Sequence, residues 1–256
     1  MTKENYKGLL ARKVLIDFLP KKLYDIHISE ESNENIKETK SWLENDPKLN
    51  MIMDFNHISF EDPWYVGYIL NKIDPKATRH VNLPVSYAHT KSSTSKAILL
   101  PAKLCGMETI RIIQANETKN SDKKNYKPGE IFKNYRNFIE RLEEIKDSQQ
   151  PTAFIISPEG HRSEDGCLGE GNKGIITIAE KLGNTFFVSV GISFNEDFNR
   201  SKPNVGRSLN LTVGKPYLYK KGDNIDYHMS KLAETLPEEM RGKWAQMPEI
   251  RRAEIL

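Results

Sequence analysis

The 256-residue chain has few cysteines, no long apolar run and almost no net charge. Two cysteines, Cys105 and Cys167, are too few for a disulfide framework and predict a reducing compartment. No apolar stretch reaches the ~18 residues that a membrane-spanning helix needs, and the first residues, MTKENYKG, lack the pattern of a secretory signal. The net charge of +3 argues against a dedicated nucleic-acid binder. We therefore expect a cytoplasmic protein that is soluble or peripheral on the inner face of the membrane.

The first 48 residues predict a helical segment in front of the main domain. Apolar residues recur at helical spacing from Leu10 to Phe18, and Pro20 predicts the end of this helix. A polar helix is expected at 33–45. The charges beside the apolar stripe are mostly basic, which suits a helix lying on an anionic membrane surface. The same stripe suits packing against the domain, and the sequence does not decide between the two.

Strands alternate with helices in the remaining domain, residues 49–256. This alternation predicts an α/β fold, a layered, mostly parallel β-sheet flanked by helices, with the N-terminal helical extension outside it. Strands are expected at 51–55, 83–88, 108–114, 151–157, 184–194 and 208–219, and helices at 62–73, 94–106, 128–148 and 173–183.

Two polar loops follow predicted strands and carry the candidate chemistry. The first loop, NHISFED, places His57 ahead of Asp62, and the second, PEGHRSEDG, contains Glu159 and Arg162. In an open α/β sheet, sites form where loops leave the carboxyl ends of strands. A histidine beside a carboxylate suits a general base with its orienting partner, and an arginine beside glycine N–H groups suits an anion.

Asp62 also has a purely local interpretation. It stands directly before Pro63, and aspartate followed by proline is a common start of a helix, with the aspartate as N-cap. A carboxylate has two oxygens, so one side chain can cap a helix and orient a histidine at the same time. We therefore expect Asp62 to do both.

Together, the two loops resemble two sequence blocks of the glycerolipid acyltransferase family, which includes lysophosphatidic acid and glycerol-3-phosphate acyltransferases. The first block of that family reads Asn-His-x4-Asp, and the third reads Phe-Pro-Glu-Gly-Thr-Arg-Ser. The resemblance covers about residues 50–215. The matching residues are Asn56, His57, Ser59, Asp62 and Pro63 in the first block and Pro158, Glu159, Gly160, Arg162 and Ser163 in the third.

The chain departs from the family pattern in both the third and the second block. Ser157 and His161 replace the usual phenylalanine and threonine of the third block. For the second block, a glycine followed by a strand that ends in arginine, the stretch GMETIRIIQ offers Gly106 and Arg111, with a spacing one residue short. Arg111 is therefore the candidate for this phosphate-binding position.

The resemblance implies transfer of a fatty acyl group from a thioester, acyl-CoA or acyl carrier protein, to a hydroxyl of a glycerol-phosphate-type acceptor such as 1-acyl-glycerol-3-phosphate. It implies His57 as the general base and Asp62 as the group that orients the imidazole. It implies no metal ion and no cofactor beyond the thioester. The acceptor side of the site would consist of Glu159, Gly160, Arg162, Ser163 and Arg111.

Other interpretations remain open. A covalent scheme would use Cys167 as a nucleophile paired with His57. The chain could be a catalytically idle lipid-binding relative, or an acyltransferase for a hydroxyl acceptor that is not a glycerolipid. A metal-dependent hydrolase would use His57, Asp62 and Glu159 as ligands, although no H-x-H or H-E-x-x-H spacing supports it.

Overall fold

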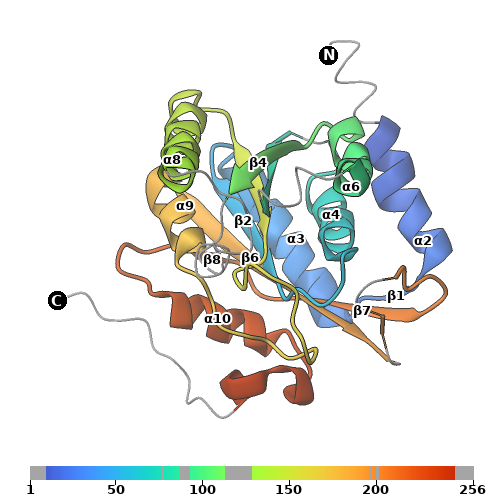
Figure 1. The fold of residues 1–256 in the computed structure, drawn as a ribbon. Coiled ribbons are helices and arrows are strands. Elements are labelled where there is room, and N and C mark those ends of the chain that lie inside the picture. The colour runs from blue at the N-terminus through green and yellow to red at the C-terminus, as the bar shows by residue number, and fades with distance from the viewer. Residues whose placement is uncertain are drawn as a thin grey trace.

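A computed structural model describes residues 10–76, 78–86, 93–112, 129–195, 198–199 and 202–245. Within these residues the chain forms one mixed β-sheet with helices on both faces (Figure 1). The strand order is β1-β7-β6-β2-β5-β3-β4, and β8 pairs with β6. All pairings are parallel except those of β6 with β7 and β8, so the predicted α/β fold is confirmed. The strands are β1 Asp25–His27, β2 Asn50–Phe55, β3 His80–Ser86, β4 Glu108–Ile112, β5 Thr152–Ile156, β6 Thr185–Phe194, β7 Ser208–Val213 and β8 Tyr217–Leu218.

The helices form two layers around this sheet. The N-terminal helix, α3, α4 and α6 cover one face, and α8, α9 and α10 cover the other. Two short 3-10 turns, η3 and η4, follow α10. The helical elements are η1 Lys13–Phe18, α2 Leu19–Leu23, α3 Glu30–Asn45, α4 Asp62–Ile73, α6 Ser93–Leu104, α8 Glu130–Asp147, α9 Gly174–Leu182, α10 Ile225–Glu234, η3 Glu238–Met240 and η4 Gly242–Ala245.

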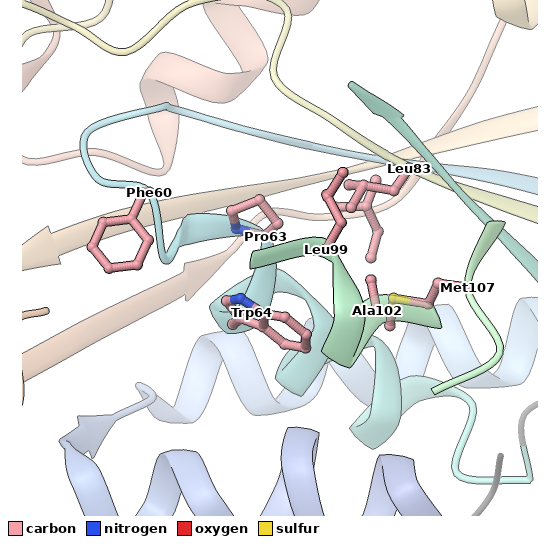
Figure 2. Close-up of a pocket in the computed structure, with 8 residues that line it drawn as sticks. Phe60, Pro63, Trp64, Leu83, Leu99, Ala102 and Met107 are labelled. Carbon is pink, nitrogen blue, oxygen red and sulfur yellow. The ribbon is translucent and has the colours of Figure 1, made fainter. Parts of the chain in front are cut away.

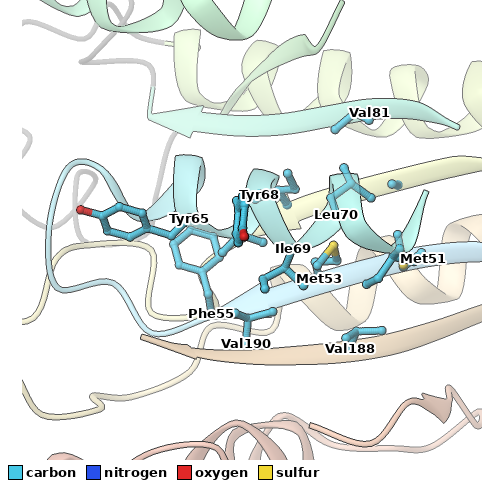
Figure 3. Close-up of a cluster of buried hydrophobic side chains, with 14 of the residues drawn as sticks. Met51, Met53, Phe55, Tyr65, Tyr68, Ile69, Leu70, Val81, Val188 and Val190 are labelled. Carbon is cyan, nitrogen blue, oxygen red and sulfur yellow. The ribbon is translucent and has the colours of Figure 1, made fainter. Parts of the chain in front are cut away.

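The central strand β2 is buried on both faces. Met51, Met53 and Phe55 point toward α4, where they pack against side chains such as Tyr65 and Ile69 (Figure 3). Its alternate residues belong to the opposite face, which α8 and α9 cover. Burial on both faces explains why apolar residues are consecutive from Met51 to Met53 rather than alternating with polar ones.

The structure corrects the prediction of one long strand at 208–219. β7 ends at Val213, and β8 is only the pair Tyr217–Leu218. The Gly214 N–H still donates to the carbonyl of Ser189 at 2.8 Å, in register with the ladder of β6 and β7, so the break between the two strands follows Gly214. The short strand β1 and the helix α10 were not predicted from the sequence.

The sequence predicts that the N-terminal helix ends at Pro20, but in the structure it continues beyond this residue. Helical structure continues from η1 into α2, and Pro20 lies in the first turn of α2. Proline has no N–H to donate, so the ladder of helical hydrogen bonds is interrupted at Pro20 while the helical conformation continues. The turn before it, η1, is a π-helix, which is wider than an α-helix: the Leu19 N–H bonds to the carbonyl of Val14, five residues back.

This N-terminal helix packs on the domain with one side and exposes the other. Ile16 is 1% exposed within the main core, and Arg12 Nε donates to the carbonyl of Cys105 at 2.7 Å. Among the described residues, no helix combines the length and the apolar character that crossing a bilayer requires. The large apolar side chains that stay exposed on this helix are Leu10, Val14, Phe18 and Leu19.

Candidate active site

The loop between β2 and α4 begins at a fixed point. Asn56 is buried, and its side-chain Nδ2 donates to the carbonyl of Ile192 on β6 at 2.9 Å. Its Oδ1 accepts from the Ile192 N–H at 2.8 Å. This pair of bonds takes over from the backbone ladder between β2 and β6 where β2 ends. The following residue, His57, therefore starts from a position set by the centre of the sheet.

The imidazole of His57 is bonded to the carboxylate of Asp62. Nδ1 of His57 lies 2.9 Å from Oδ2 of Asp62. The Asp62 side chain is fully buried, whereas the His57 side chain keeps 23% of its surface exposed. Since an ionised carboxylate can only accept, this contact puts the proton on Nδ1 and leaves a lone pair on Nε2. The pair thus combines a fixed tautomer with access from outside.

Asp62 does not cap α4, contrary to our expectation. Its Oδ2 also accepts from the N–H groups of Ile58 and Ser59 at 2.6 and 2.7 Å, and its Oδ1 accepts from Ser59 Oγ at 2.7 Å. The N-cap position belongs to Glu61, which makes no side-chain cap bond. The carboxylate of Asp62 turns back into the loop because three donors and the imidazole converge there. Asp62 therefore shapes the whole loop around His57.

Glu159, in the second polar loop, joins that loop to the first one. Its Oε2 accepts from the backbone N–H of His57 at 2.8 Å, and its Oε1 accepts from the N–H of Gly169 at 2.9 Å. The side chain is 1% exposed. Burial raises the pKa of Glu159, and the two N–H donors act in the opposite direction. The buried carboxylate of Glu159 thus fixes the backbone of His57 from the interior of the protein.

The second loop touches the first through its backbone as well. The N–H of Ser163 donates to the carbonyl of His57 at 2.7 Å. The hydroxyl of Ser163 serves its own loop, because it donates to Asp165 Oδ1 at 3.0 Å and accepts from the Gly166 N–H at 2.9 Å. Gly160 has a φ of +71°, a conformation that favours glycine in this turn. Both predicted residues therefore shape the loop.

The two predicted arginines lie at different places. Arg162 is half-buried on the second loop, directly before Ser163, whose backbone contacts His57. Arg111 is exposed on the edge strand β4, which is separated from β2 by β5 and β3. Three strand spacings amount to about 14 Å. The structure therefore places Arg162 on the loop that contacts the backbone of His57 and keeps Arg111 at the edge of the sheet.

An apolar cavity begins beside the first loop. It lies between the start of α4, the carboxyl-end half of the sheet and α6, and it has a volume of about 40 Å³ (Figure 2). By volume it holds roughly three water-sized groups, so it is a narrow slot. The residues that line it are Phe60, Pro63, Trp64, Leu83, Leu99, Ala102, Met107 and Ile155.

Cys167 is poorly suited to nucleophilic attack. Its Sγ donates to the carbonyl of Glu239 at 3.4 Å. Burial and the nearby Asp165 raise the pKa of the Cys167 thiol, which disfavours the reactive thiolate. As for a metal, the residues that the structure describes contain no group of three or more His, Cys, Asp or Glu side chains placed to hold an ion.

Two residues of this region were not singled out in the sequence. Gly169 provides the second donor to Glu159, and Trp244 of η4 holds the carbonyl of Gly169 with its indole N–H at 3.0 Å. Neither belongs to a recognisable motif, and Trp244 lies 75 positions from Gly169. Only the folded chain brings them to the site.

In comparisons with known proteins, no family model matches this chain, and no curated protein is similar enough in sequence to count as a match.

Proposed function

We propose that this chain is an acyltransferase that moves a fatty acyl group from an acyl thioester, acyl-CoA or acyl carrier protein, to a hydroxyl of a glycerol-phosphate-type acceptor such as 1-acyl-glycerol-3-phosphate. The observation that carries the proposal is the contact of 2.9 Å between His57 Nδ1 and the buried Asp62. It prepares an accessible Nε2 to accept a proton, which is the role of a general base.

The proposed reaction needs no covalent enzyme intermediate. Nε2 of His57 takes the proton of the acceptor hydroxyl while the hydroxyl oxygen attacks the thioester carbonyl. The tetrahedral intermediate then collapses, the C–S bond breaks, and the thiolate leaves with the proton returned from the imidazolium. The carboxylate of Asp62 stabilises that imidazolium, as in the triads of serine hydrolases. An ester and a free thiol are the products.

The surroundings of the base supply a polar and an apolar side. Arg162 adds a guanidinium next to the loop that contacts His57, and such a group binds a phosphate through paired, charge-assisted hydrogen bonds. On the other side, Phe60 and Pro63, neighbours of Asp62, open the apolar slot. A hydrocarbon chain gains about 0.8 kcal/mol per buried CH₂. The slot has room for only the first few methylenes of an acyl chain, and these, with a phosphate near Arg162, suit the proposed substrates.

A lipid surface is the proposed place of action. Exposed apolar side chains recur on the N-terminal helix, where Leu10, Val14 and Phe18 are 54%, 47% and 55% exposed. On α6, Leu100 and Leu104 are each 53% exposed. The two helices lie side by side and are joined by the bond from Arg12 to the carbonyl of Cys105 (Figure 1). Lys13, Lys21 and Lys22 add positive charge, which favours an anionic bilayer.

The test is release of free thiol from acyl-CoA and from acyl carrier protein over a panel of hydroxyl acceptors. Acceptor-dependent release is expected, with His57→Ala lowering kcat by roughly 10²–10⁴-fold and leaving the circular dichroism unchanged. Release of thiol only with acceptors that lack a glycerol phosphate would show that the acceptor belongs to another class of hydroxyl compound. Lipid binding without any turnover would identify an idle lipid-binding relative and end the enzymatic proposal.

A further inference from the structure

The C-terminal turns η3 and η4 close on the loop that follows Glu159. The N–H of Leu168 donates to the carbonyl of Met240 at 2.7 Å, and the indole N–H of Trp244 donates to the carbonyl of Gly169 at 3.0 Å. The backbones nearly touch here, because a Cβ on Gly242 would come within 2.8 Å of the Leu168 carbonyl. Two turns at the far end of the described chain are thus bonded to the residues that directly follow the second polar loop.

Trp244 is built into this contact rather than resting on the surface. Its side chain is 5% exposed and packs in a separate apolar cluster with Leu168 and residues of α10 such as Met229 and Leu232. Its indole N–H is the one polar group that the side chain must satisfy on burial. The carbonyl of Gly169 satisfies it, so the indole is locked in orientation as well as in position.

The residue that Trp244 holds is the one that holds Glu159. The carbonyl of Gly169 accepts from Trp244, and its N–H donates to Glu159 Oε1 at 2.9 Å. Oε2 of the same carboxylate accepts from the backbone N–H of His57 at 2.8 Å. A Cβ on Gly169 would lie 3.3 Å from Oε1, so the approach leaves little slack. Four groups therefore form one continuous chain of contacts from η4 to the base.

We propose that Trp244 is a positioning residue of the active site: its indole N–H fixes Gly169, and through the carboxylate of Glu159 it fixes the backbone of His57. The contacts themselves do not depend on the proposed function. The expected effect on kcat rests on the acyl transfer proposed above. Removing the indole N–H frees Gly169 to move, one of the two donors to Glu159 becomes mobile, and the base departs more often from the geometry in which Nε2 can accept a proton.

The test removes the N–H in two ways: Trp244→Phe also loses part of the ring, whereas an isostere keeps the bulk. In Trp244→Phe we expect kcat for acyl transfer to fall about tenfold, with KM changed by less than about twofold, and the thermal midpoint to fall as well because the smaller ring leaves space in the buried cluster. The Nδ1–H proton of His57, observed by NMR in the hydrogen bond to Asp62, should exchange faster with water. The benzothienyl isostere of tryptophan at position 244, in which sulfur replaces N–H, should reproduce the lower kcat and the faster exchange.

Trp42→Phe is the matched control. Trp42 is half-buried on α3, lies near Phe186 with the rings tilted by 57° and their centres 5.6 Å apart, and is outside the chain of contacts to His57. It should change neither kcat nor the His57 proton. An unchanged kcat in both Trp244 variants would overturn the inference, as would a loss in Trp244→Phe that the isostere does not share. A wild-type protein without any transfer would defeat the proposed function alone, and the NMR signal would still decide the role of Trp244.

Discussion

The buried carboxylate of Glu159 accepts a hydrogen bond from the backbone N–H of His57 at 2.8 Å, although 102 positions separate the two residues in sequence. This bond makes Glu159 a part of the frame that holds the base. The residue is 1% exposed and both of its oxygens are occupied by backbone N–H groups. We therefore assign Glu159 to fixing the loops.

Asp62→Asn should lower both activity and stability. The carboxylate is fully buried and accepts from Ile58 N, Ser59 N, Ser59 Oγ and the imidazole of His57. An amide turns one acceptor oxygen into a donor that faces other donors, which costs about 3 kcal/mol for a buried charged group that loses its partners. Chemical denaturation should show the loss in unfolding free energy, and kcat should fall with it. A variant as stable as the wild type would contradict the bonding pattern described for Asp62.

Arg162→Ala and Arg162→Lys should both weaken the phosphate acceptor. A hydrogen bond to a charged group contributes about 1.5–3 kcal/mol, or roughly 10–100-fold in kcat/KM, and an ammonium does not reproduce the paired geometry of a guanidinium. Hydrolysis of the thioester by water should change little, because it needs no acceptor. The measurement is the ratio of acceptor transfer to hydrolysis. If both reactions decline together and the thermal midpoint drops, Arg162 braces its loop instead of binding phosphate.

Asp54 should make stability depend on pH. This carboxyl is completely buried on β2 beside Ser189 Oγ, which lies 3.1 and 3.2 Å from its two oxygens, and burial raises its pKa from 3.8 to about 7. The partial burial of Tyr217 on β8 raises the pKa of its hydroxyl, and the charge of Asp54 adds to that shift. Between these two pH values the folded carboxyl keeps a proton that the unfolded one has lost. Stability from this group is therefore complete below pH 3.8 and declines as the pH rises through about 7.

Asp54→Asn removes that dependence, because an amide has no proton to lose. We expect its thermal midpoint, relative to the wild type, to be higher at pH 8 than at pH 5 by at least about 3 °C, or roughly 1 kcal/mol for a domain of this size. Asp147→Asn, at the exposed end of α8, is the control and should show the same difference at both pH values. If the thermal midpoint of Asp54→Asn differs from that of the wild type by the same amount at pH 5 and pH 8, Asp54 does not titrate in this range.

Phe18→Ser and Leu104→Ser should each weaken binding to anionic vesicles. Both side chains are more than half exposed on adjacent helices, and inserting one into lipid contributes about 1.5–3 kcal/mol, roughly tenfold or more in affinity. Phe132→Ser is the matched control, since Phe132 is 72% exposed on α8, across the sheet. Flotation with vesicles of phosphatidylglycerol and phosphatidylcholine measures the effect. Equal flotation of all three variants, or none for the wild type, would rule this surface out.

Most strands and helices could be predicted from the sequence because each is longer than the period of its apolar pattern. The run MIMDF and the helix that starts at Asp62 were both expected where the structure has them, and their burial is what their apolar residues require. The two elements that were not predicted from the sequence are β1 and α10. β1 has only three residues, too few to show a period, and α10 has the clear N-cap Asn224, whose Oδ1 accepts from the Tyr227 N–H at 2.8 Å. That signal was present and was overlooked.

The sequence by itself determined the layered α/β architecture and the meeting of His57 with Asp62, because periodicity and a spacing of a few residues act within one segment of chain. Asp62 turns into its loop instead of capping α4 through a competition that is also local, because the donors of Ile58 and Ser59 lie four and three residues away. Only the tertiary structure joined Glu159, Gly169 and Trp244 behind the base. Bonds between distant segments form where packed layers hold them in place, and no local pattern of residues encodes them.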